Sequence, residues 1–362
     1  MVYIGVDLHR KVSQVAALEA DGELIWNRRI RSRPEEFSRI FGDLTVQPAG
    51  VAFEATYGWS WFADLLGDLG LPAHMAHPLA TKAISSARVK NDAVDAKTLA
   101  HLLRTNLLPE AWIGPPECRE ARRLVRTRAA LVRFRSRLKC QVLAVLADHG
   151  VQLPELRDMF GKDGRRFLEA TAVPTQSQLC INADLRLIDE LTKEIHQLDR
   201  ELVAFFKADP RMPRLRAIHG IGFFTAAVII AEVWDVDRFR RPDQLCSWAG
   251  LTPKERSSAG HIRRSHITKQ GSRVLRWALV EAATVAPRDP GHRRYFMQVL
   301  HNERRRTKIA RLALARRLLT LCYYALRDEG GCRAYPVGQR TRRLPVTGAL
   351  GAVLASTDGR VI

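Results

Sequence analysis

Four carboxylates in the first 95 residues have the placement of a cation site. Asp7 ends the apolar run VYIGVD, and Glu54 lies in a second such run, GVAFEAT. Asp92 and Asp95 are three residues apart in a helical pattern, so they share one face of that helix. Gathered carboxylates repel one another unless cations lie between them. Mg²⁺ binds a few carboxylates while keeping waters and phosphate oxygens, and two such ions activate both oxygens of a phosphoryl transfer.

Each acid also has a structural interpretation. Asp92 could be the N-cap of a helix with Asp95 in its first turn, where the helix dipole favours an acid. Asp7 and Glu54 could be polar residues at strand ends. Both lie in otherwise apolar strands, where an unpaired carboxylate is costly. The four together therefore favour a site for Mg²⁺, or for Mn²⁺ in its place.

A pair of serines, Ser257 and Ser258, lies in the cationic stretch ERSSAGHIRRSHITKQGSRVLR (255–276). A serine needs a base, a metal or dense positive charge to act as a nucleophile. His261 and His266 are near but fit phosphate contacts or surface residues better than a triad. On these residues alone the pair is expected on a phosphate-binding loop before a helix. The candidate cationic contacts to phosphate are Arg256, Arg263, Arg264, Lys269, Arg273 and Arg276.

A second candidate phosphate contact is the turn in HGIGFFTAAVIIAEV (219–233). Two short helices joined at Gly220 and Gly222 would expose backbone amides that hold a DNA phosphate without reading a base. A tight packing turn that only glycine permits explains the same residues. The pattern therefore supports a helix-hairpin-helix but does not establish one.

The charge is distributed unevenly along the chain. There are 58 Lys and Arg against 38 Asp and Glu, a net charge of +20, but residues 1–115 hold only 12 of the basic and 13 of the acidic residues. The remaining residues carry +21. A uniformly basic surface would not be divided in this way. The asymmetry favours a catalytic module joined to a module that grips nucleic acid.

Several classes of protein are disfavoured. No apolar run of about 18 residues suggests a membrane span, and the start MVYIGVDLHRK lacks the features of a signal peptide, so a cytoplasmic location is expected. The six cysteines show no C-x-x-C pair, which argues against a zinc site and a disulfide framework.

The first 115 residues show strands that alternate with helices after an antiparallel opening, which predicts an α/β domain with a mixed sheet. An Asp-Gly turn at 21–22 predicts a hairpin. The expected strands are 2–8, 11–20, 22–30, 50–56 and 72–78, and the expected helices are 34–43, 59–70 and 91–103.

Beyond a linker at 114–117, the pattern is almost wholly helical. Long helices are expected at 118–150 and 182–209, the second with a heptad-like seam that could pair within the chain or between subunits. The last helix is expected at 303–328, before a basic and flexible tail. The predicted domains are 1–115, 116–206, 207–330 and 331–362.

In this order, the motifs resemble the DEDD transposases of the insertion-sequence one-ten family, which are RNA-guided recombinases. The likeness covers residues 1–330. The N-terminal half of the likeness rests on YIGVDLHRK, FEAT and VKNDAVDAKTLAHLLR. The C-terminal half rests on IHGIGFFTAAVIIAEV, FRRPDQLCSWAGLTPKERSSAG and ITKQGSRVLRWALVEAA.

The resemblance implies a RuvC/RNase H-like domain, a helical coiled-coil insertion and a transposase domain with a helix-hairpin-helix. It makes Asp7, Glu54, Asp92 and Asp95 a Mg²⁺-binding tetrad. It makes Ser257 the nucleophile that forms a 5′-phosphoserine link to DNA, with Ser258 kept open because Ala259 stands where the family pattern has glycine. It further implies a structured guide RNA, donor and target DNA, and a dimer that pairs as a tetramer on DNA.

Two other functions remain as alternatives. The acidic domain could be a metal-dependent, structure-specific endonuclease that uses water, with a purely structural serine segment. The chain could also be a non-catalytic nucleic-acid-binding regulator, although the presence of all four acids disfavours that.

Overall fold

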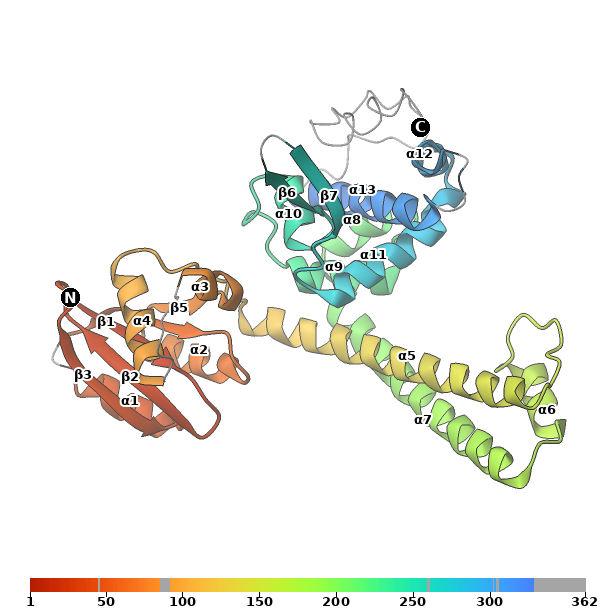
Figure 1. Cartoon of the computed structure of the whole chain (residues 1–362), viewed down its shortest axis with the longest axis horizontal. Coiled ribbons are helices and arrows are strands. Elements are labelled where there is room, and N and C mark those ends of the chain that lie inside the picture. The colour runs from red at the N-terminus through yellow and green to blue at the C-terminus, as the bar shows by residue number, and fades with distance from the viewer. Residues whose placement is uncertain (45, 85–91, 259–260, 302, 304–305, 329–362) are drawn as a thin grey trace. The chain divides into compact units, whose positions relative to one another are not determined.

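The structure, a computed structural model, describes residues 1–44, 46–84, 92–258, 261–301, 303 and 306–328, without the side chains of 255–258 and 261–265. The chain forms two compact units, Met1–Pro115 and Pro116–Ile362 (Figure 1). The expected tail, 331–362, lies outside the described residues. No helix among the described residues is long and apolar enough to cross a membrane.

The first unit is built on a five-stranded mixed sheet with the order β3-β2-β1-β4-β5. Neighbours β1, β2 and β3 are antiparallel, whereas β4 is parallel to both β1 and β5. The prediction of an N-terminal α/β fold with a mixed sheet is confirmed. The strands are β1 (Val2–Asp7), β2 (Val12–Leu18), β3 (Leu24–Arg31), β4 (Pro48–Glu54) and β5 (Ala73–Ala76).

Helices cover both faces of this sheet (Figure 1). Ile4 and Phe53 belong to a buried cluster that includes Phe37 of one helix and Phe62 of the next. On the other face, Ala52 and Ala76 pack against Leu99. The helices are α1 (Pro34–Gly42), α2 (Trp59–Asp68), α3 (Pro78–Ile84), which the sequence did not predict, and α4 (Asp92–Arg104).

The second unit begins with two long helices, α5 (Pro116–Asp148) and α7 (Thr175–Phe206), joined through α6 (Lys162–Ala170). They run antiparallel, because Arg128 of α5 pairs with Asp199, whereas His149, just past the end of α5, contacts Ser177, near the start of α7. The long helices were predicted, but α7 begins seven residues before the expected 182, and α6 was missed.

The seam predicted along α7 packs within the chain. Ile181, Leu185 and Ile188 form a buried cluster with Val142 and Leu146 of α5. The alternative left open by the sequence, pairing between subunits, is therefore not needed to bury these side chains.

The rest of the second unit is a helical body with one two-stranded sheet. Its core surrounds α9, whose residues from Ala226 to Val233 are all buried. The elements are α8 (Arg211–Arg216), α9 (Phe223–Val233), α10 (Pro242–Trp248), β6 (Pro253–Ser258), β7 (His261–Ile267), α11 (Arg273–Val285), the 3₁₀ turn η1 (Ala286–Arg288), α12 (Pro290–Leu300) and α13 (Thr307–Arg327).

Candidate active site

Two of the predicted acids stand at the same ends of adjacent parallel strands. Val6 of β1 is in register with Phe53 of β4, and the next residues are Asp7 and Glu54. Side chains alternate between the two faces of a strand, so Asp7 shares a face with Gly5, and Glu54 shares one with Ala52. Ala52 packs against Leu99 of α4. Both carboxylates therefore belong to the face that α4 covers.

Gly5 allows α4 to lie close to this face. A Cβ at residue 5 would stand 2.0 Å from the carbonyl oxygen of Ala96 and 2.6 Å from the amide nitrogen of Ala100. Any side chain here would push α4 away from β1. The contact brings the first turn of α4, with Asp92 and Asp95, onto the side of the sheet where Asp7 lies.

A histidine that the sequence analysis did not select completes a group of three. Nε2 of His9 lies 3.1 Å from Oδ2 of Asp7 and 3.8 Å from Oδ1 of Asp92. One ligand atom from each of the three residues lies within 4.8 Å of the other two. The signal available in the sequence was the spacing Asp-Leu-His, because a histidine just past the strand end can turn back toward the carboxylate.

Asp7 is a buried carboxylate that no described Lys or Arg neutralises. The side chain is largely buried, and desolvation raises the pKa of Asp7 above its usual value. His9 lowers that pKa, whereas the nearby charges of Asp92 and Asp95 raise it. Among the described residues no Lys or Arg forms an ion pair with Asp7. Two carboxylates and an imidazole that share a small space without a permanent cation suit a divalent metal ion.

Glu54 and Asp95 stand next to this group but outside the cluster of three. Glu54 is half-buried at the end of β4, and Asp95 acts on Asp7 through its charge. The strand ends are tied together because the hydroxyl of Thr56 donates to the carbonyl of Leu8 at 2.9 Å. The structure thus brings Asp7 and Asp92 together with His9, and it places Glu54 and Asp95 at the same edge.

The predicted serine loop is a strand, and that part of the prediction is wrong. Ser257 and Ser258 end β6, where they are in register with Ile262 and His261 of β7. Only two residues separate the strands in sequence, which is the commonest length of a hairpin connection. Those residues, 259–260, lie outside the described part of the chain, as do the side chains of both serines.

The predicted cationic contacts divide into three groups. The side chains of Arg256, Arg263 and Arg264 in the hairpin lie outside the described part. Lys269 and Arg273 are exposed, one before and one at the start of α11.

Arg276 differs because its guanidinium holds the turn that precedes its own helix. Nη1 of Arg276 donates to the carbonyls of Ala249 at 3.0 Å and Gly271 at 3.1 Å, and also to that of Gln270. Burial, followed by the charge of Arg273, lowers the pKa of Arg276. These bonds give Arg276 a structural role in this arrangement.

The glycine turn joins α8 to α9, as the sequence predicted. Gly220 has a φ of +95°, and a Cβ there would stand 2.9 Å from the carbonyl oxygen of Ala282. Gly222 is the N-cap of α9, and a Cβ there would meet nothing within 4 Å. Gly220 is thus required by backbone and packing, whereas the space beside Gly222 is open at a helix N-terminus whose first amides lack intrahelical partners.

Two models of known families match parts of the chain. Residues 4–150 match a model of DEDD transposases of the IS110 type, described as "Transposase", and residues 212–297 match the "Transposase IS116/IS110/IS902 family". The chain belongs to this transposase family. The first match contains all four predicted acids with His9, and the second contains the serine hairpin. A transposase is an enzyme that cuts and transfers DNA, so the chain carries that activity class.

This chain is similar to individual transposases over most of its length. It is 27% identical over 293 residues to a "Probable family 20 transposase" of Pseudomonas aeruginosa, covering 79% of this chain and 84% of the relative. It is 26% identical over 286 residues to the "Transposase for insertion sequence element IS1111A" of Coxiella burnetii, covering 77% and 76%. A "Putative transposase y4pF/y4sB" of Sinorhizobium fredii is 26% identical over 327 residues, covering 89% and 83%.

Proposed function

We propose that this transposase cuts and rejoins DNA through a covalent serine–phosphate intermediate, assisted by Mg²⁺ bound at the acidic site. The observation that carries the proposal is the edge where β1, β4 and α4 meet. It gathers acids around a buried carboxylate, Asp7, that has no Lys or Arg partner among the described residues. The strand order and the packing of α4 support a RuvC/RNase H-like catalytic domain at 1–115.

The acids and His9 would act as ligands in this proposal. Asp7, Glu54, Asp92 and Asp95 hold the metal through carboxylate oxygens. His9 adds a nitrogen ligand or orients Asp7 through the 3.1 Å contact to its Oδ2. A bound divalent ion supplies positive charge to the oxygens of the phosphate under attack. Asp7 is held in place because β1 is a central strand that pairs with β2 on one side and β4 on the other.

The serine pair would supply the nucleophile. Oγ of Ser257, or of Ser258, loses its proton and attacks phosphorus, so the Oγ–P bond forms and the P–O3′ bond breaks. The released 3′ oxygen takes a proton, and the 5′ phosphate stays on the serine. The number of phosphate ester bonds is unchanged, so rejoining needs no external energy source. Lys269, Arg273 and the hairpin arginines stabilise the charge that builds on the phosphate.

The second unit would hold nucleic acid. Its +21 charge supports binding to DNA and to a structured guide RNA. The α8–α9 turn supports a helix-hairpin-helix that contacts a phosphate through amides near Gly222. The long α5–α7 pair, a coiled-coil region at 116–206, would take part in dimers and tetramers on DNA through side chains other than the seam that packs within the chain. Acids and serine from different subunits would then complete one site. Sequencing of RNA that copurifies with the chain tests the guide.

The decisive experiment asks whether a covalent protein–DNA adduct forms. Ser257→Ala, Ser258→Ala and the double variant are incubated with DNA carrying the element ends, and the adduct is separated by denaturing gel. The proposal expects one single variant and the double variant to lose the adduct. Ser265→Ala, in the opposite strand β7, is the matched control and keeps it.

The same experiment separates the alternative of a metal-dependent endonuclease that uses water. In that case the wild-type chain and both serine variants cleave DNA in Mg²⁺ without forming any adduct. Adduct that survives in the double variant contradicts the serine mechanism.

A further inference from the structure

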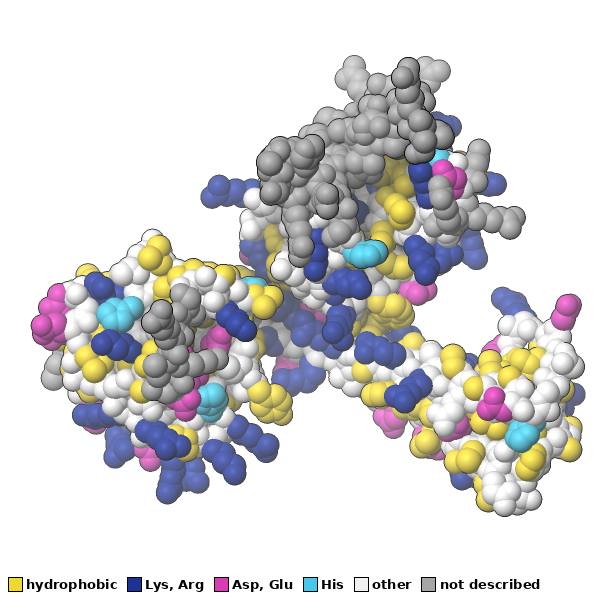
Figure 2. Space-filling view, in the orientation of Figure 1, with side chains coloured by type: hydrophobic (Ala, Val, Ile, Leu, Met, Phe, Trp, Pro, Cys, Tyr) yellow, Lys and Arg dark blue, Asp and Glu magenta, His cyan; other side chains and the backbone are white. Residues whose placement is uncertain are grey.

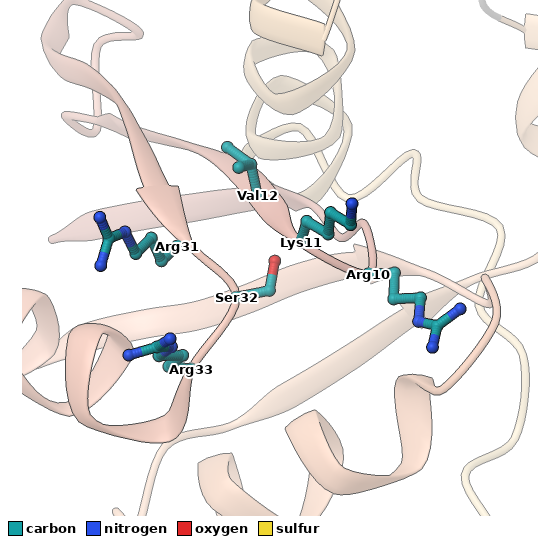
Figure 3. Close-up of a pocket in the computed structure, with 6 residues that line it drawn as sticks. All are labelled: Arg10, Lys11, Val12, Arg31, Ser32 and Arg33. Atoms are coloured by element: carbon teal, nitrogen blue, oxygen red, sulfur yellow. The ribbon is translucent and has the colours of Figure 1, made fainter.

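A basic pocket lies beside the acidic site of the first unit. It is lined by Arg10, Lys11 and Val12 from the start of β2 and by Arg31, Ser32 and Arg33 from the end of β3 (Figure 3). The two segments are held together because the amide of Ser32 donates to the carbonyl of Lys11 at 3.0 Å, while Val12 is in register with Arg31. The pocket is thus a built feature of the sheet edge.

The cations of this pocket have no acidic partners within the part of the chain that the structure describes. Arg10, Lys11, Arg31 and Arg33 are all exposed, and none of them forms an ion pair with a described residue. Six of the 12 basic residues in the first 115 positions lie at 10–11 and 28–33, and neither segment holds an acid. A unit with almost no net charge therefore has a strongly positive margin, and Figure 2 shows Lys and Arg side chains gathered along one edge of it.

The cationic side chains do not converge on one point. In Figure 3, Arg31 and Arg33 extend to one side of Ser32, whereas Arg10 extends to the other. A small anion is held best by groups that point at it together. Charges spread over several positions instead match a chain of phosphates, each of which meets a different cation.

The pocket is joined to the acidic site by the turn between β1 and β2. Oγ of Ser13, a buried residue, accepts a hydrogen bond from the amide of His9 at 3.3 Å and lies 2.7 Å from Oγ of Ser32. Ser13 thus connects the histidine of the acidic cluster to the wall of the pocket. Asp7 and Arg10 are three Cα–Cα steps apart along the chain, so their Cα atoms are at most about 11 Å apart.

We propose that this pocket binds the phosphates of the DNA strand that flank the phosphate at the acidic site. Phosphates on one strand follow one another along the duplex, so a pocket this near to Asp7 lies within a few nucleotides of the bond that is cut. It positions the strand and reads no bases, because Lys and Arg contacts to phosphate carry no sequence information. The proposal rests on the proposed function for the identity of the neighbouring site.

Chemical protection of Lys11 tests this directly in the full-length chain. An amine-acylating reagent is applied in EDTA with and without a short duplex, a single-stranded DNA and an RNA of the same sequence, and modification is measured by mass spectrometry. Lys82, an exposed lysine of the same unit, is the internal control. The proposal expects saturating DNA to abolish most of the modification of Lys11 and little of that of Lys82.

A pair of variants measures the electrostatic contribution. Arg31→Gln/Arg33→Gln removes two contacts and should lower the slope of log binding constant against log salt concentration for DNA by about 2. Arg39→Gln/Lys82→Gln removes the same charge from the same unit, outside the pocket, and should change that slope much less.

Lys11 that stays equally reactive with and without DNA, or that only RNA protects, overturns the proposal. So does an equal change of slope in the two double variants. Adduct formation by the wild-type chain reports on the proposed function separately, so the failure of either idea is recognised without the other.

Discussion

Asp7 of the first unit and Glu232 of the second are both buried carboxylates, and they are used in opposite ways. Glu232, at the end of α9, is 1% exposed, and Arg126 of α5 grips it with Nε 2.8 Å from Oε1 and Nη2 2.7 Å from Oε2. Arg122 adds a nitrogen 3.9 Å from Oε2. Asp7 is 7% exposed, and among the described residues only the imidazole of His9 pairs with its carboxylate. The carboxylate of Glu232 is thus neutralised by arginine, whereas no described Lys or Arg neutralises that of Asp7.

This difference separates a carboxylate with a structural role, Glu232, from one in the candidate active site, Asp7. The Glu232 group fastens α5 to α9. Arg122 also satisfies the end of the helix, since it donates to the carbonyls of Ala231 and Glu232. Arg238, whose pKa is lowered to about 10 chiefly by burial, donates to the carbonyl of Val233. At Asp7 burial without a fixed cation costs stability, a cost that functional sites tolerate because a ligand relieves it.

The largest effect is expected from Asp7→Asn. Strand cleavage should fall by more than about 100-fold, on the order of the loss when one group that stabilises a transition state is removed. The thermal midpoint should stay or rise, because the amide removes a buried charge that has no Lys or Arg partner among the described residues. Cleavage assays and thermal unfolding measure the two quantities on the same protein. Asp68→Asn, at an exposed position of the same unit, should leave cleavage unchanged.

Arg126→Met, in contrast to Asp7→Asn, should lower stability. It leaves Glu232 buried without its main partner and should lower the free energy of unfolding of the second unit by about 3 kcal/mol, near the lower end for a broken buried pair because Arg122 remains. Glu232→Gln should cost less, since the Arg126 side chain is 52% exposed and regains water. Denaturant unfolding measures the loss of stability in both variants. Equal losses would contradict the view that buried Glu232 depends on Arg126 more than Arg126 depends on Glu232.

Divalent metal should stabilise one unit only. Mg²⁺ or Mn²⁺ at about 100 times its dissociation constant should add about 2.7 kcal/mol to the stability of the unit that binds it. The gain should disappear in Asp7→Asn and persist in Arg126→Met. Calorimetric scans with and without chelator resolve this, and a gain that Asp7→Asn retains would place the ion elsewhere.

The smallest effect is expected from Ser13→Ala. Its buried hydroxyl contacts the amide of His9 and the hydroxyl of Ser32, so removal should cost about 1 kcal/mol. Ser38→Ala, on α1, is the comparison and should cost less. If the cleavage rate of Ser13→Ala falls although the protein remains folded, Ser13 positions the turn between β1 and β2.

Sequence patterns selected the acids of this edge because the signal for each is local. Asp7 and Glu54 end apolar runs, and the spacing of Asp92 and Asp95 places them on one helical face. Which acids meet depends on the pairing of β1 with β4 and on the close approach of α4, which local patterns do not give. His9 was missed because its role depends on a turn geometry that no periodicity encodes.

The serine segment was predicted as a loop because its residues are polar and basic. The strands β6 and β7 form through backbone pairing, which needs no apolar alternation. Gly5 likewise gave no signal, since only the packed structure shows that Ala96 lies 2.0 Å from where its Cβ would be. Features set by contacts between distant segments are the ones that local patterns leave out.

The most direct test of the division between the units is the adduct assay carried out with and without Mg²⁺. Wild-type chain and Asp7→Asn are each incubated with DNA in Mg²⁺ and in EDTA. We expect a covalent serine–DNA adduct only for the wild type in Mg²⁺, because in the proposed mechanism the acids of the first unit activate the phosphate that the serine of the second attacks. Equal adduct in EDTA, or in Asp7→Asn, would contradict it.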